Sequence, residues 1–457
     1  MFHRIFDDGL AQSSFVVGCD RTRLAAVVDP RRDVDVYVEL ARQHGLTLAL
    51  AIETHVHADF VSGAHELASV GAEIVAGPGA GLRIPHREAR DAEQFRLGDL
   101  TITALHTPGH TPEHISLLIE HPGDPKRVLT GDTLFVGAVG RPDLLGAERG
   151  RELAGHLYVS IFQKLLALAD DVEVHPGHGA GSLCGSGIGN ELHSTIGQER
   201  RFNPMLQHRT QAAFVEAVLR DLPETPPYFT ELKRLNQQGP PLLHLAGGIP
   251  AVPALSPADA HQAVKQGATL IDLRQAPAFA QGYASGALNI GYGPKIGYWA
   301  GWVVPLTSPV VLLHDGDLKR IDTARLELLR IGIDTVVGYV EGGFDAWRAA
   351  GLPTAHLENI NAVDLRARDA QTDRITILDV RSKREFAADH IDGAIHIPVG
   401  ALPARMRDVP QGKPIATICE GGYRSSLAAS LLARGGMAPV FSVSGGMIAY
   451  RVLETTA

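Results

Sequence analysis

Histidines and aspartates that follow apolar runs constrain this chain more than any other feature. The segment THVHADF at residues 54–60 follows an apolar run at 46–52 that predicts a buried strand. Three similar segments follow, with HTPGH at 106–110, TGDT at 130–133 and HPGH at 175–178. Imidazoles and carboxylates at strand ends, each followed by Gly, Pro or another turn residue, suit borderline divalent metals. A lone histidine usually has only a structural role, but four such segments in this order and spacing predict a metal site.

This set of motifs resembles that of the metallo-β-lactamase superfamily, whose fold is a four-layer αββα sandwich. Members with two metals usually carry an Asp-His pair at the end of the first motif, and both residues serve the second metal. Here the pair is Asp59-Phe60, and a phenylalanine side chain cannot bind a metal. One metal is therefore favoured over two. Two histidines and one carboxylate with open positions are the pattern of non-haem Fe(II) oxygenases.

Within the superfamily, the chain resembles the persulfide dioxygenase family. The resemblance implies one Fe(II) per chain, with Zn or Mn as less favoured metals, held by His55, His110 and Asp132. The run LFVGAVGRPDL at 134–144 also looks like that family. Further residues are expected to orient the ligands or to line the substrate pocket, namely His57, Asp59, His178, Arg141 and Cys184.

Cys184 lies in the glycine-rich segment GAGSLCGSG at 179–187, directly after His178. Such backbone beside a metal pocket could bind a polar substrate, and a thiol there could hold a sulfur intermediate. A tolerated small residue in a loop explains the spacing equally well. Cys19 lies in an apolar stretch and is expected to belong to the core.

Local patterns predict several elements of the first domain. Residues 15–19 and 24–29 look like paired strands, and residues 34–44 have helical spacing that ends before Gly45. Residues 151–169 and 209–219 are predicted as further helices.

Length and composition bound the possible functions. A chain of 457 residues is expected to hold two to four domains. Its net charge of -9 and pI near 6.2 argue against nucleic acid or an anionic membrane as partner. The first residues contain no apolar signal-peptide core and no run of 18 apolar residues occurs, so neither secretion nor a membrane span is expected. The three cysteines lie far apart, form no disulfide framework and suit a reducing, cytoplasmic compartment.

The second half of the chain repeats itself. ATLIDLR at 268–274 is echoed by ITILDVR at 375–381, and EGGFDAW at 341–347 by SGGMIAY at 444–450. Each copy spans about 100 residues of alternating strand and helix patterns. The repeated phrases resemble rhodanese domains, which contain a buried parallel sheet. The expected fold class is α/β multidomain: an αββα metallo-β-lactamase sandwich at 1–245, followed by rhodanese-like domains at 246–355 and 356–457.

The second copy carries a candidate nucleophile. A predicted strand at 415–418 runs into CEGGYRS at 419–425, and a helix is predicted from 426 to 434. Backbone N–H groups of such a loop point at the sulfur, and the helix N-terminus and Arg424 add positive potential that favours the thiolate. Cys419 is therefore expected to carry a sulfane sulfur as a persulfide, within a cradle formed by Glu420, Gly421, Gly422 and Tyr423. A buried structural cysteine is the plainer alternative, and Asp379 and Arg381 are expected to be structural.

The first copy departs from this pattern. A predicted strand at 310–313 leads into HDGDLK at 314–319, which contains no cysteine. His314 falls where the nucleophile should be, and two acids replace the amide-rich cradle. This copy cannot carry a persulfide by that route and is expected to serve packing or an interface.

A metal centre and a persulfide-carrying thiol on one chain share sulfane sulfur as their common substrate. The architecture looks like the persulfide dioxygenase–rhodanese fusions of sulfide detoxification. That resemblance implies oxidation of glutathione or coenzyme A persulfide to sulfite by O2, and sulfur transfer by Cys419 between persulfide, sulfite and thiosulfate, in either direction. A homo-oligomer, either a dimer or a tetramer, is expected. Two alternatives stay open: a zinc-dependent thioester hydrolase of the glyoxalase II kind fused to a sulfurtransferase, and a non-enzymatic sulfur carrier or sensor.

Overall fold

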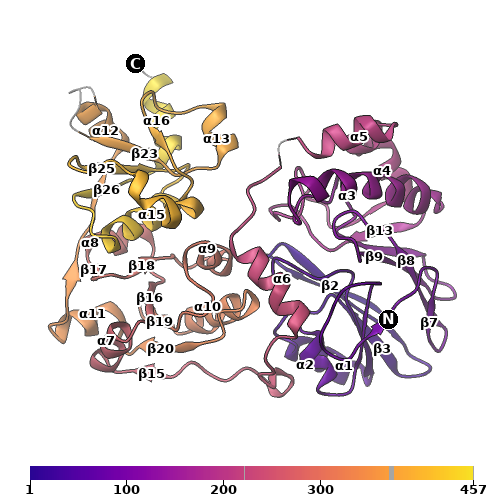
Figure 1. Ribbon diagram of the computed structural model, residues 1–457. Helices are drawn as coiled ribbons and strands as arrows, with labels where there is room; N and C mark the ends of the chain where they lie inside the picture. Colours follow the sequence, from indigo (N-terminus) through magenta and orange to yellow (C-terminus); the bar gives the residue numbers. More distant parts are fainter. Residues whose placement is uncertain (221, 370–374, 456–457) are drawn as a thin grey trace. The chain divides into compact units, whose positions relative to one another are not determined.

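The computed structural model describes residues 1–220, 222–369 and 375–455 (Figure 1). The chain divides into two compact units, which we describe separately. The N-terminal unit comprises Met1–Pro250 with Leu329–Gly332, and the C-terminal unit comprises Ala251–Leu328 with Ile333–Ala457. Among the described residues, every helix is too short or too polar to cross a membrane.

The N-terminal unit is built on two six-stranded sheets. The first has the order β1-β2-β3-β4-β5-β6, and the second the order β14-β13-β10-β9-β8-β7. The strands of the first sheet are β1 (Phe2–Asp7), β2 (Gln12–Cys19), β3 (Leu24–Val28), β4 (Thr47–Ile52), β5 (Glu73–Ala76) and β6 (Arg87–Glu88). Those of the second are β7 (Gln94–Leu97), β8 (Leu100–His106), β9 (Ile115–Glu120), β10 (Arg127–Gly131), β13 (Glu173–Pro176) and β14 (Ser194–Thr195).

Alternating side chains on the strands create the layers of this unit. In β2, Phe15 and Val17 point into a core shared with Ile102 and Leu117 of the second sheet, whereas Val16 packs in a separate cluster on the outer face. Burying one such apolar side chain contributes about 1.5–3 kcal/mol. Helices cover both outer faces: α1 (Asp35–His44) and α2 (Ala64–Ala68) on the first sheet, α3 (Ala147–Val159), α4 (Ile196–Phe202) and α5 (Gln211–Val218) on the second. The result is an αββα sandwich.

Several local predictions can be compared with this unit. The strands β2 and β3 pair antiparallel, from Phe15 with Val28 to Cys19 with Leu24. Helix α1 ends before Gly45, whose φ of 62° suits a residue without a side chain. The helix expected at 151–169 is interrupted, because a π-helical turn at Ser160–Lys164 and a 3₁₀ turn at Leu165–Ala167 follow α3. At the junction, the hydroxyl of Ser160 donates to the carbonyl of Pro108, a long-range contact that helical periodicity cannot reveal.

The C-terminal unit contains the repeat as two five-stranded parallel sheets of equivalent order. The first copy has the order β15-β20-β19-β16-β18, and the second has the order β22-β26-β25-β23-β24. The first sheet comprises β15 (Ala254–Leu255), β16 (Thr269–Asp272), β18 (Leu288–Asn289), β19 (Val310–Leu313) and β20 (Val336–Val340). The second comprises β22 (Glu358–Ile360), β23 (Thr376–Asp379), β24 (Ile395–His396), β25 (Ile415–Ile418) and β26 (Val440–Val443).

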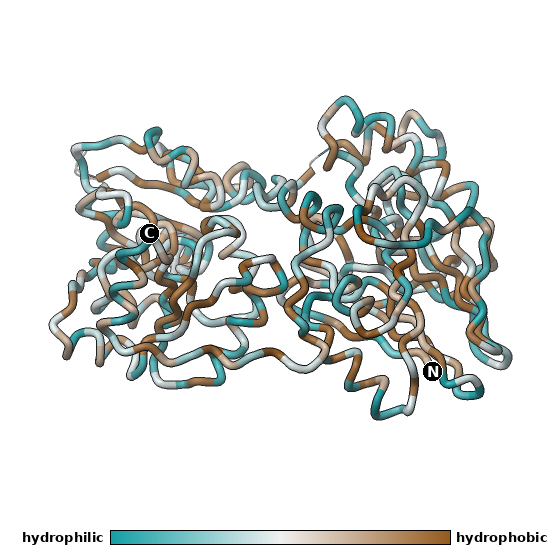
Figure 2. Tube along the Cα trace, turned by 60° about the horizontal axis from the view of Figure 1, so that its bottom comes forward, coloured by the Kyte–Doolittle hydropathy of each residue, from teal (hydrophilic) through white to brown (hydrophobic). Residues whose placement is uncertain are grey.

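Helices flank both sheets of the C-terminal unit. The first copy carries α7 (Pro257–Lys265), α8 (Ala276–Gln281), α9 (Ile296–Val303), α10 (Lys319–Arg330) and α11 (Gly343–Ala349). The second carries α12 (Ala362–Asp369), α13 (Lys383–Ala388), α14 (Leu402–Arg405), α15 (Tyr423–Arg434) and α16 (Gly446–Thr455). Every residue of the central strands β16, β19, β23 and β25 is buried, which explains their continuous apolar runs. Hydrophobic and hydrophilic segments alternate along the chain in Figure 2, as this layering requires.

Candidate metal centre and candidate sulfur-transfer loop

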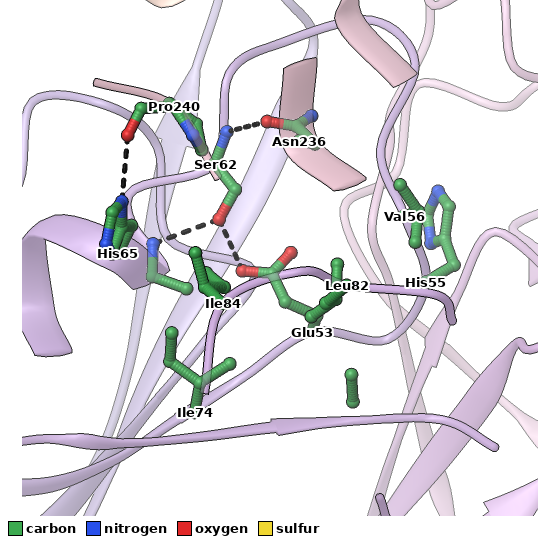
Figure 3. Close-up of a pocket in the computed structure, with 12 residues that line it drawn as sticks. Glu53, His55, Val56, Ser62, His65, Ile74, Leu82, Ile84, Asn236 and Pro240 are labelled. Carbon is green, nitrogen blue, oxygen red and sulfur yellow. Dashed lines mark hydrogen bonds between the residues drawn. The ribbon is translucent and has the colours of Figure 1, made fainter. Parts of the chain in front are cut away.

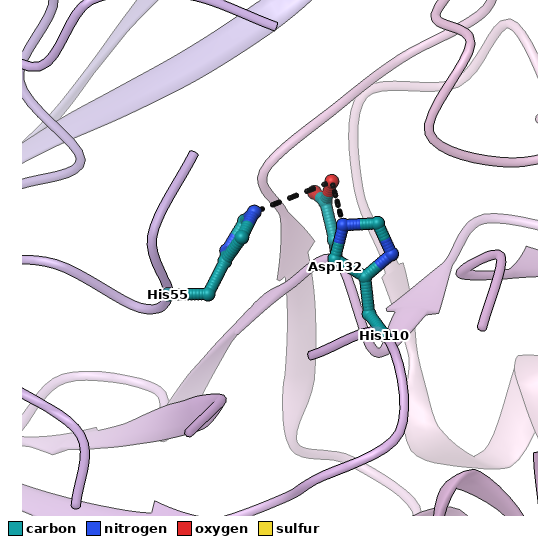
Figure 4. Close-up of side chains that lie close together, drawn as sticks. All are labelled: His55, His110 and Asp132. Atoms are coloured by element: carbon teal, nitrogen blue, oxygen red, sulfur yellow. Dashed lines mark ion pairs between the residues drawn. The ribbon is translucent and has the colours of Figure 1, made fainter. Parts of the chain in front are cut away.

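Three side chains from separate loops of the N-terminal unit converge on one point. His55 follows β4, His110 lies between β8 and β9, and Asp132 follows β10. All three are buried, with exposed fractions of 2%, 1% and 0%. Oδ2 of Asp132 lies 3.8 Å from Nε2 of His55 and 3.5 Å from Nε2 of His110 (Figure 4). One ligand atom from each residue fits within 4.8 Å of the others, so the three can hold one metal ion.

Hydrogen bonds fix the tautomers of both imidazoles. Nδ1 of His110 lies 2.8 Å from the carbonyl oxygen of Arg141, which can only accept, so Nδ1 carries the proton. The hydroxyl of Thr54 donates to Asp29 at 2.9 Å and therefore accepts from Nδ1 of His55 at 2.9 Å. Both Nε2 atoms keep a lone pair for a metal.

Two polar atoms at this point have no hydrogen-bond partner among the described residues: Nε2 of His55 and Oδ2 of Asp132. Buried polar atoms are normally paired, and a bound cation would satisfy both. Two imidazoles and one carboxylate also match the donor set of a non-haem iron site. These residues therefore fit the metal that the sequence predicts.

The protonation states suit metal binding. Burial lowers the pKa of His55 well below its usual value and also lowers that of His110, so both rings are neutral. Burial alone would raise the pKa of Asp132, but the charge and the hydrogen bond of His178 outweigh it and lower that pKa well below its usual value. The three groups are thus held as two neutral imidazoles and one carboxylate.

His57, the other histidine of the first motif, is held by different partners. Its Nε2 lies 3.1 Å from Asp29 and 3.3 Å from Glu53, and its ring packs 4.3 Å from that of Phe60. Burial would lower the pKa of His57, but these two carboxylates raise it well above its usual value. His57 lies outside the group formed by His55, His110 and Asp132, and its donor atoms group with those of Asp29 and Glu53 instead.

Glu53 connects this arrangement to a small cavity beside the first motif. The cavity is lined by apolar side chains, including Ile74, Leu82 and Ile84, together with His55 and Glu53 (Figure 3). The hydroxyl of Ser62 donates to Glu53 at 2.5 Å and accepts from the backbone N–H of Ala64 at 3.0 Å. The chain after the motif is thereby tied to the carboxylate that holds His57.

His178 bridges two carboxylates, one of which belongs to the candidate metal ligands. Its Nδ1 lies 2.7 Å from Asp132, and its Nε2 lies 2.7 Å from Asp59. Burial would lower the pKa of His178, but Asp132 and Asp59 raise it to about 10. Cys184 is buried nearby, and burial followed by the charges of Asp59 and Asp132 raises the pKa of its thiol well above its usual value.

The side chain of Arg141, which the sequence predicted to line the pocket, makes hydrogen bonds to other residues of the protein. Its guanidinium makes two 2.8 Å hydrogen bonds to Asp143, a third at 2.8 Å to Thr225, and a fourth at 3.2 Å to the carbonyl of Leu183. Its backbone N–H donates to the carbonyl of Cys184 at 2.9 Å. Arg141 therefore braces the loop that carries Cys184, and its own carbonyl orients His110.

Sequence reasoning missed His114. Its Nε2 accepts the backbone N–H of Asp132 at 3.0 Å, and its Nδ1 lies 3.0 Å from the hydroxyls of Thr107 and Thr133. Burial lowers the pKa of His114 to about 3, so this ring is neutral and structural. The signal was present, because His114 lies four residues after His110 on the same loop.

The loop after β25 holds the thiol of Cys419. Its Sγ accepts the backbone N–H groups of Gly422 at 3.1 Å and Ser425 at 3.3 Å, and the residue is 1% exposed. Helix α15 begins at Tyr423, so its positive end also faces the sulfur. Ser425, which the sequence analysis did not single out, thus completes the cradle.

The start of α16 supports the base of this loop. The backbone N–H groups of Met447 and Ile448 donate to the carbonyls of Cys419 and Glu420, at 2.8 and 3.1 Å. A Cβ atom on Gly446 would lie 2.1 Å from the carbonyl oxygen of Cys419, so only glycine permits this approach. The paired glycines of the repeat therefore serve the sulfur loop.

The charged cradle residues are paired with other side chains. Arg424 makes two hydrogen bonds to Glu385, at 2.7 and 2.6 Å, and Glu420 accepts from Arg451 at 2.6 and 3.0 Å. Burial would raise the pKa of Glu385, but Arg424 and Ser382 lower it to about 2. The positive charge expected from Arg424 is thus shared with a carboxylate 39 residues earlier in the chain.

The first copy contacts the helix that follows the sulfur loop. The hydroxyl of Tyr423 donates to the carbonyl of Gly291 at 3.0 Å. The hydroxyl of Ser426 donates to Oδ1 of Asn289 at 2.5 Å, and the backbone N–H of Asn289 donates to Ser430 at 3.1 Å. The cysteine-less copy therefore holds the first turns of α15.

Comparisons with known proteins identify both halves of the chain. Residues 7–178 match the metallo-beta-lactamase superfamily, and residues 256–350 and 361–452 match the rhodanese-like domain. A solved structure described as a metallo-beta-lactamase from Staphylococcus aureus is 31% identical, with a TM-score of 0.65 over 74% of this chain and 98% of that chain. This chain belongs to the metallo-beta-lactamase superfamily and carries two rhodanese-like domains. The predicted fold class is confirmed.

Two characterised relatives match the metallo-beta-lactamase domain. The hydroxyacylglutathione hydrolase GloC of Haemophilus influenzae is 32% identical over 213 residues, which cover 42% of this chain and 91% of that protein. The human mitochondrial persulfide dioxygenase ETHE1 is 29% identical over 217 residues, which cover 45% of this chain and 76% of that protein. The similarity thus includes a hydrolase and a dioxygenase, and both belong to enzyme families.

Proposed function

We propose that this protein oxidises a low-molecular-weight thiol persulfide, such as glutathione or coenzyme A persulfide, to sulfite with O2, and that its second rhodanese-like domain transfers sulfane sulfur. The observation that carries this proposal is the set of His55, His110 and Asp132, with both Nε2 lone pairs directed at one point. Similarity to the persulfide dioxygenase ETHE1 supports it, and so do the rhodanese-like domains on the same chain. Sulfide detoxification in the cytoplasm is the corresponding cellular role.

In this proposal, His55, His110 and Asp132 hold one Fe(II). Bound there, the iron would supply the oxygen chemistry that converts the terminal sulfur of a persulfide, with O2 and water, to sulfite, free thiol and protons. Thr54 and the carbonyl of Arg141 keep the two ligand imidazoles in the correct tautomer. His178 orients Asp132 through its Nδ1 hydrogen bond, and burial of all three ligands excludes bulk water from the centre.

The sulfur-transfer step uses groups of the second rhodanese-like domain. The thiolate of Cys419 attacks the outer sulfur of a persulfide, the inner thiolate leaves, and a cysteine persulfide forms. The amides of Gly422 and Ser425, which donate to Sγ, stabilise negative charge on sulfur. Sulfite then attacks the outer sulfur of this persulfide, which gives thiosulfate and regenerates the thiolate.

A zinc-dependent thioester hydrolase is the second candidate, because the hydrolase GloC is as similar to this chain as the dioxygenase ETHE1. One feature of the site favours the dioxygenase. His57, the second histidine of the first motif, pairs with Asp29 and Glu53 and does not join the group of candidate ligands. That group therefore consists of three residues, His55, His110 and Asp132.

Oxygen consumption by anaerobically iron-loaded protein, given glutathione persulfide, tests the proposal. The wild type is expected to consume O2 and to release thiosulfate, whereas Cys419→Ser should consume O2 and release sulfite. Asp132→Asn should bind no iron and consume no O2, and the exposed His44→Gln in the same domain serves as the control. Protein that retains zinc, consumes no O2 with any persulfide and cleaves a glutathione thioester would establish the hydrolase instead.

A further inference from the structure

A small cavity beside the first metal motif has no part in the metal binding described above. It lies within the N-terminal unit, and its wall is largely apolar, with Val56, Ile74, Ala76, Leu82 and Ile84 among the lining residues (Figure 3). The space open to the centre of a water-sized molecule is about 20 Å³. One small molecule therefore fits, because a single water needs roughly 10–15 Å³ of such space.

Apart from the candidate ligand His55, the buried polar side chains of the wall already have partners. The hydroxyl of Ser62 donates to Glu53 at 2.5 Å, and the other oxygen of that carboxylate lies 3.3 Å from Nε2 of His57. The amide of Asn236 donates to two backbone carbonyls of the first motif, each at 2.8 Å. Its oxygen accepts the backbone N–H of Ser62 at 2.9 Å. A buried water needs about two to four polar partners, so this cavity favours an apolar occupant.

The end of helix α6 (Tyr228–Gln238) fixes the outer part of the wall. The backbone N–H of Arg83 donates to the carbonyl of Gln237 at 2.7 Å. A Cβ atom on Gly239 would lie 2.2 Å from a methyl carbon of Ile84, so only glycine permits this close approach. The cavity is therefore held open by backbone contacts and is present without a ligand.

The cavity extends from the surface to a candidate metal ligand. Leu82 and Ile84 are half-buried and form its outer end. Ile74, Ala76 and His55 are 2%, 1% and 2% exposed. His55 belongs both to this wall and to the group that can hold the metal, and its Nε2 is directed at that group. A small molecule in the cavity thus lies next to a ligand imidazole.

We propose that this cavity binds O2 and supplies it to the metal centre from the side of His55. O2 is a small apolar molecule, and an apolar cavity whose buried polar side chains are already paired accommodates such a molecule better than water. The step is binding alone, because no bond forms or breaks in the cavity. The inference rests on the proposed function, which requires O2 at the metal, and adds the place at which the protein takes it up.

Dissolved O2 is itself the probe, because its unpaired electrons speed the relaxation of methyl groups near it. In metal-free protein under O2 pressure, the methyl groups of Ile74 should respond at least about twofold more strongly than those of the equally buried Ile161. Leu82→Trp fills the outer end of the cavity and should lower the response of Ile74 to that of Ile161. Leu168→Trp is the matched control, because it changes a half-buried leucine of the same unit that does not line the cavity.

Oxygen kinetics test the supply of O2 to the metal. In iron-loaded protein, Leu82→Trp should raise the KM for O2 about tenfold without loss of bound iron, whereas Leu168→Trp should change neither. If Leu82→Trp proves unfolded by circular dichroism, Ile84→Phe narrows the same end of the cavity and takes its place.

Two results would overturn the inference. One is an equal response of Ile74 and Ile161 in the wild type, and the other is an unchanged KM for O2 in a variant that has lost the Ile74 response. A strong Ile74 response in protein that consumes no O2 with any persulfide would instead refute the proposed function. It would remove the supply of O2 to the metal but not the binding of O2 in the cavity, so the two failures are distinguishable.

Discussion

The two rhodanese-like domains share a scaffold but differ in the one loop that can do chemistry. Both have the same strand order, and both place a glycine against the carbonyl that starts the loop, where a Cβ atom would lie 2.3 Å from His314 or 2.1 Å from Cys419. Both also contain a buried pair of an aspartate and an arginine two residues later, Asp272 with Arg274 and Asp379 with Arg381. These shared features therefore serve the fold and do not mark the reaction.

The loops themselves use their central residue in opposite ways. Cys419 presents a sulfur that accepts two backbone N–H groups. His314 has both ring nitrogens occupied, because Nδ1 accepts the N–H of Gly316 at 2.8 Å and Nε2 lies 3.1 Å from the carbonyl of Val340. The acids that follow it, Asp315 and Asp317, pair with Arg320 at 2.6 and 3.4 Å. The imidazole thus fills the loop as a structural group.

The largest effect expected from this difference follows substitution of the two central residues. Cys419→Ser should lower sulfur transfer by at least ~10³-fold, because it removes the nucleophile. His314→Ala should leave the rate of transfer within about twofold and should destabilise the domain by about 1–3 kcal/mol, since the N–H of Gly316 and the buried carbonyl of Val340 lose their partner. Transfer of sulfur from thiosulfate to cyanide by the full chain measures both. A loss of transfer in His314→Ala comparable to that in Cys419→Ser would show that the first copy takes part in the reaction.

Loss of the arginine from either buried aspartate–arginine pair should lower the free energy of unfolding by a similar amount. Removing one partner of a buried ion pair costs about 3–5 kcal/mol, so Arg274→Met and Arg381→Met should each destabilise the C-terminal unit by that amount. Tryptophan fluorescence during urea unfolding measures this loss, because the three tryptophans, Trp299, Trp302 and Trp347, all lie in the first copy.

The same measurement tests whether the two copies unfold together. They form one compact unit, so Arg381→Met in the second copy should shift the tryptophan transition of the first. A transition that moves with Arg274→Met but not with Arg381→Met would show that the copies unfold independently. The exposed pair of Arg368 with Glu358 offers a control, because Arg368→Met should cost less than about 1 kcal/mol.

Sequence patterns predicted the parts of the molecule that depend on near neighbours. Strands β19 and β25 begin and end at the predicted residues, since continuous apolar runs bounded by polar loops define buried parallel strands. The strand-and-turn pattern predicted a set of metal-binding motifs, and the choice of His55, His110 and Asp132 within that set came from the family resemblance. The fold class followed from the repeat and from the family resemblance.

Long-range contacts could not be predicted in the same way. Arg424 pairs with Glu385, which lies 39 residues earlier in the chain. The loop sequence alone suggested that the positive charge of Arg424 acts on the thiol of Cys419, but Glu385 partly neutralises that charge. Cys184 and Asp59 are 125 positions apart by their numbers, and only the fold brings their donor atoms together. The support of α15 by Asn289 likewise depends on how two copies pack, which no local pattern encodes.

That support predicts a moderate effect of Asn289→Ala. The substitution removes the acceptor of the Ser426 hydroxyl and so loosens the helix whose first turn holds the sulfur. We expect a loss of about 1–2 kcal/mol in stability and a ~3–10-fold slower transfer of sulfur. Asn289 acts on the thiol by positioning the start of α15, whose N–H groups donate to Sγ of Cys419. The pH dependence of Cys419 alkylation should therefore also shift, whereas a loss of stability alone would leave it unchanged. Unchanged transfer with reduced stability would restrict the first copy to packing.

The smallest effect concerns the ion pair of Glu385 and Arg424. The first copy lacks this pair, because Ala278 occupies the position that corresponds to Glu385. Each of these residues lies six positions after the aspartate of the buried pair, Asp272 or Asp379. The folded pKa of Glu385, lowered to about 2 against burial by Arg424 and Ser382, lies below the value of 4.5 for a free glutamate. A lowered folded pKa stabilises the domain above pH 4.5, and this contribution disappears as the pH falls from 4.5 towards 2. Glu385→Gln keeps the capping box with Ser382, so it removes mainly the charge. Hydrogen exchange of the α15 amides should therefore be faster in Glu385→Gln than in the wild type at pH 7, and the difference should vanish near pH 2. A difference that persists at low pH would show that Glu385 acts through its shape and hydrogen bonds, and not through its charge.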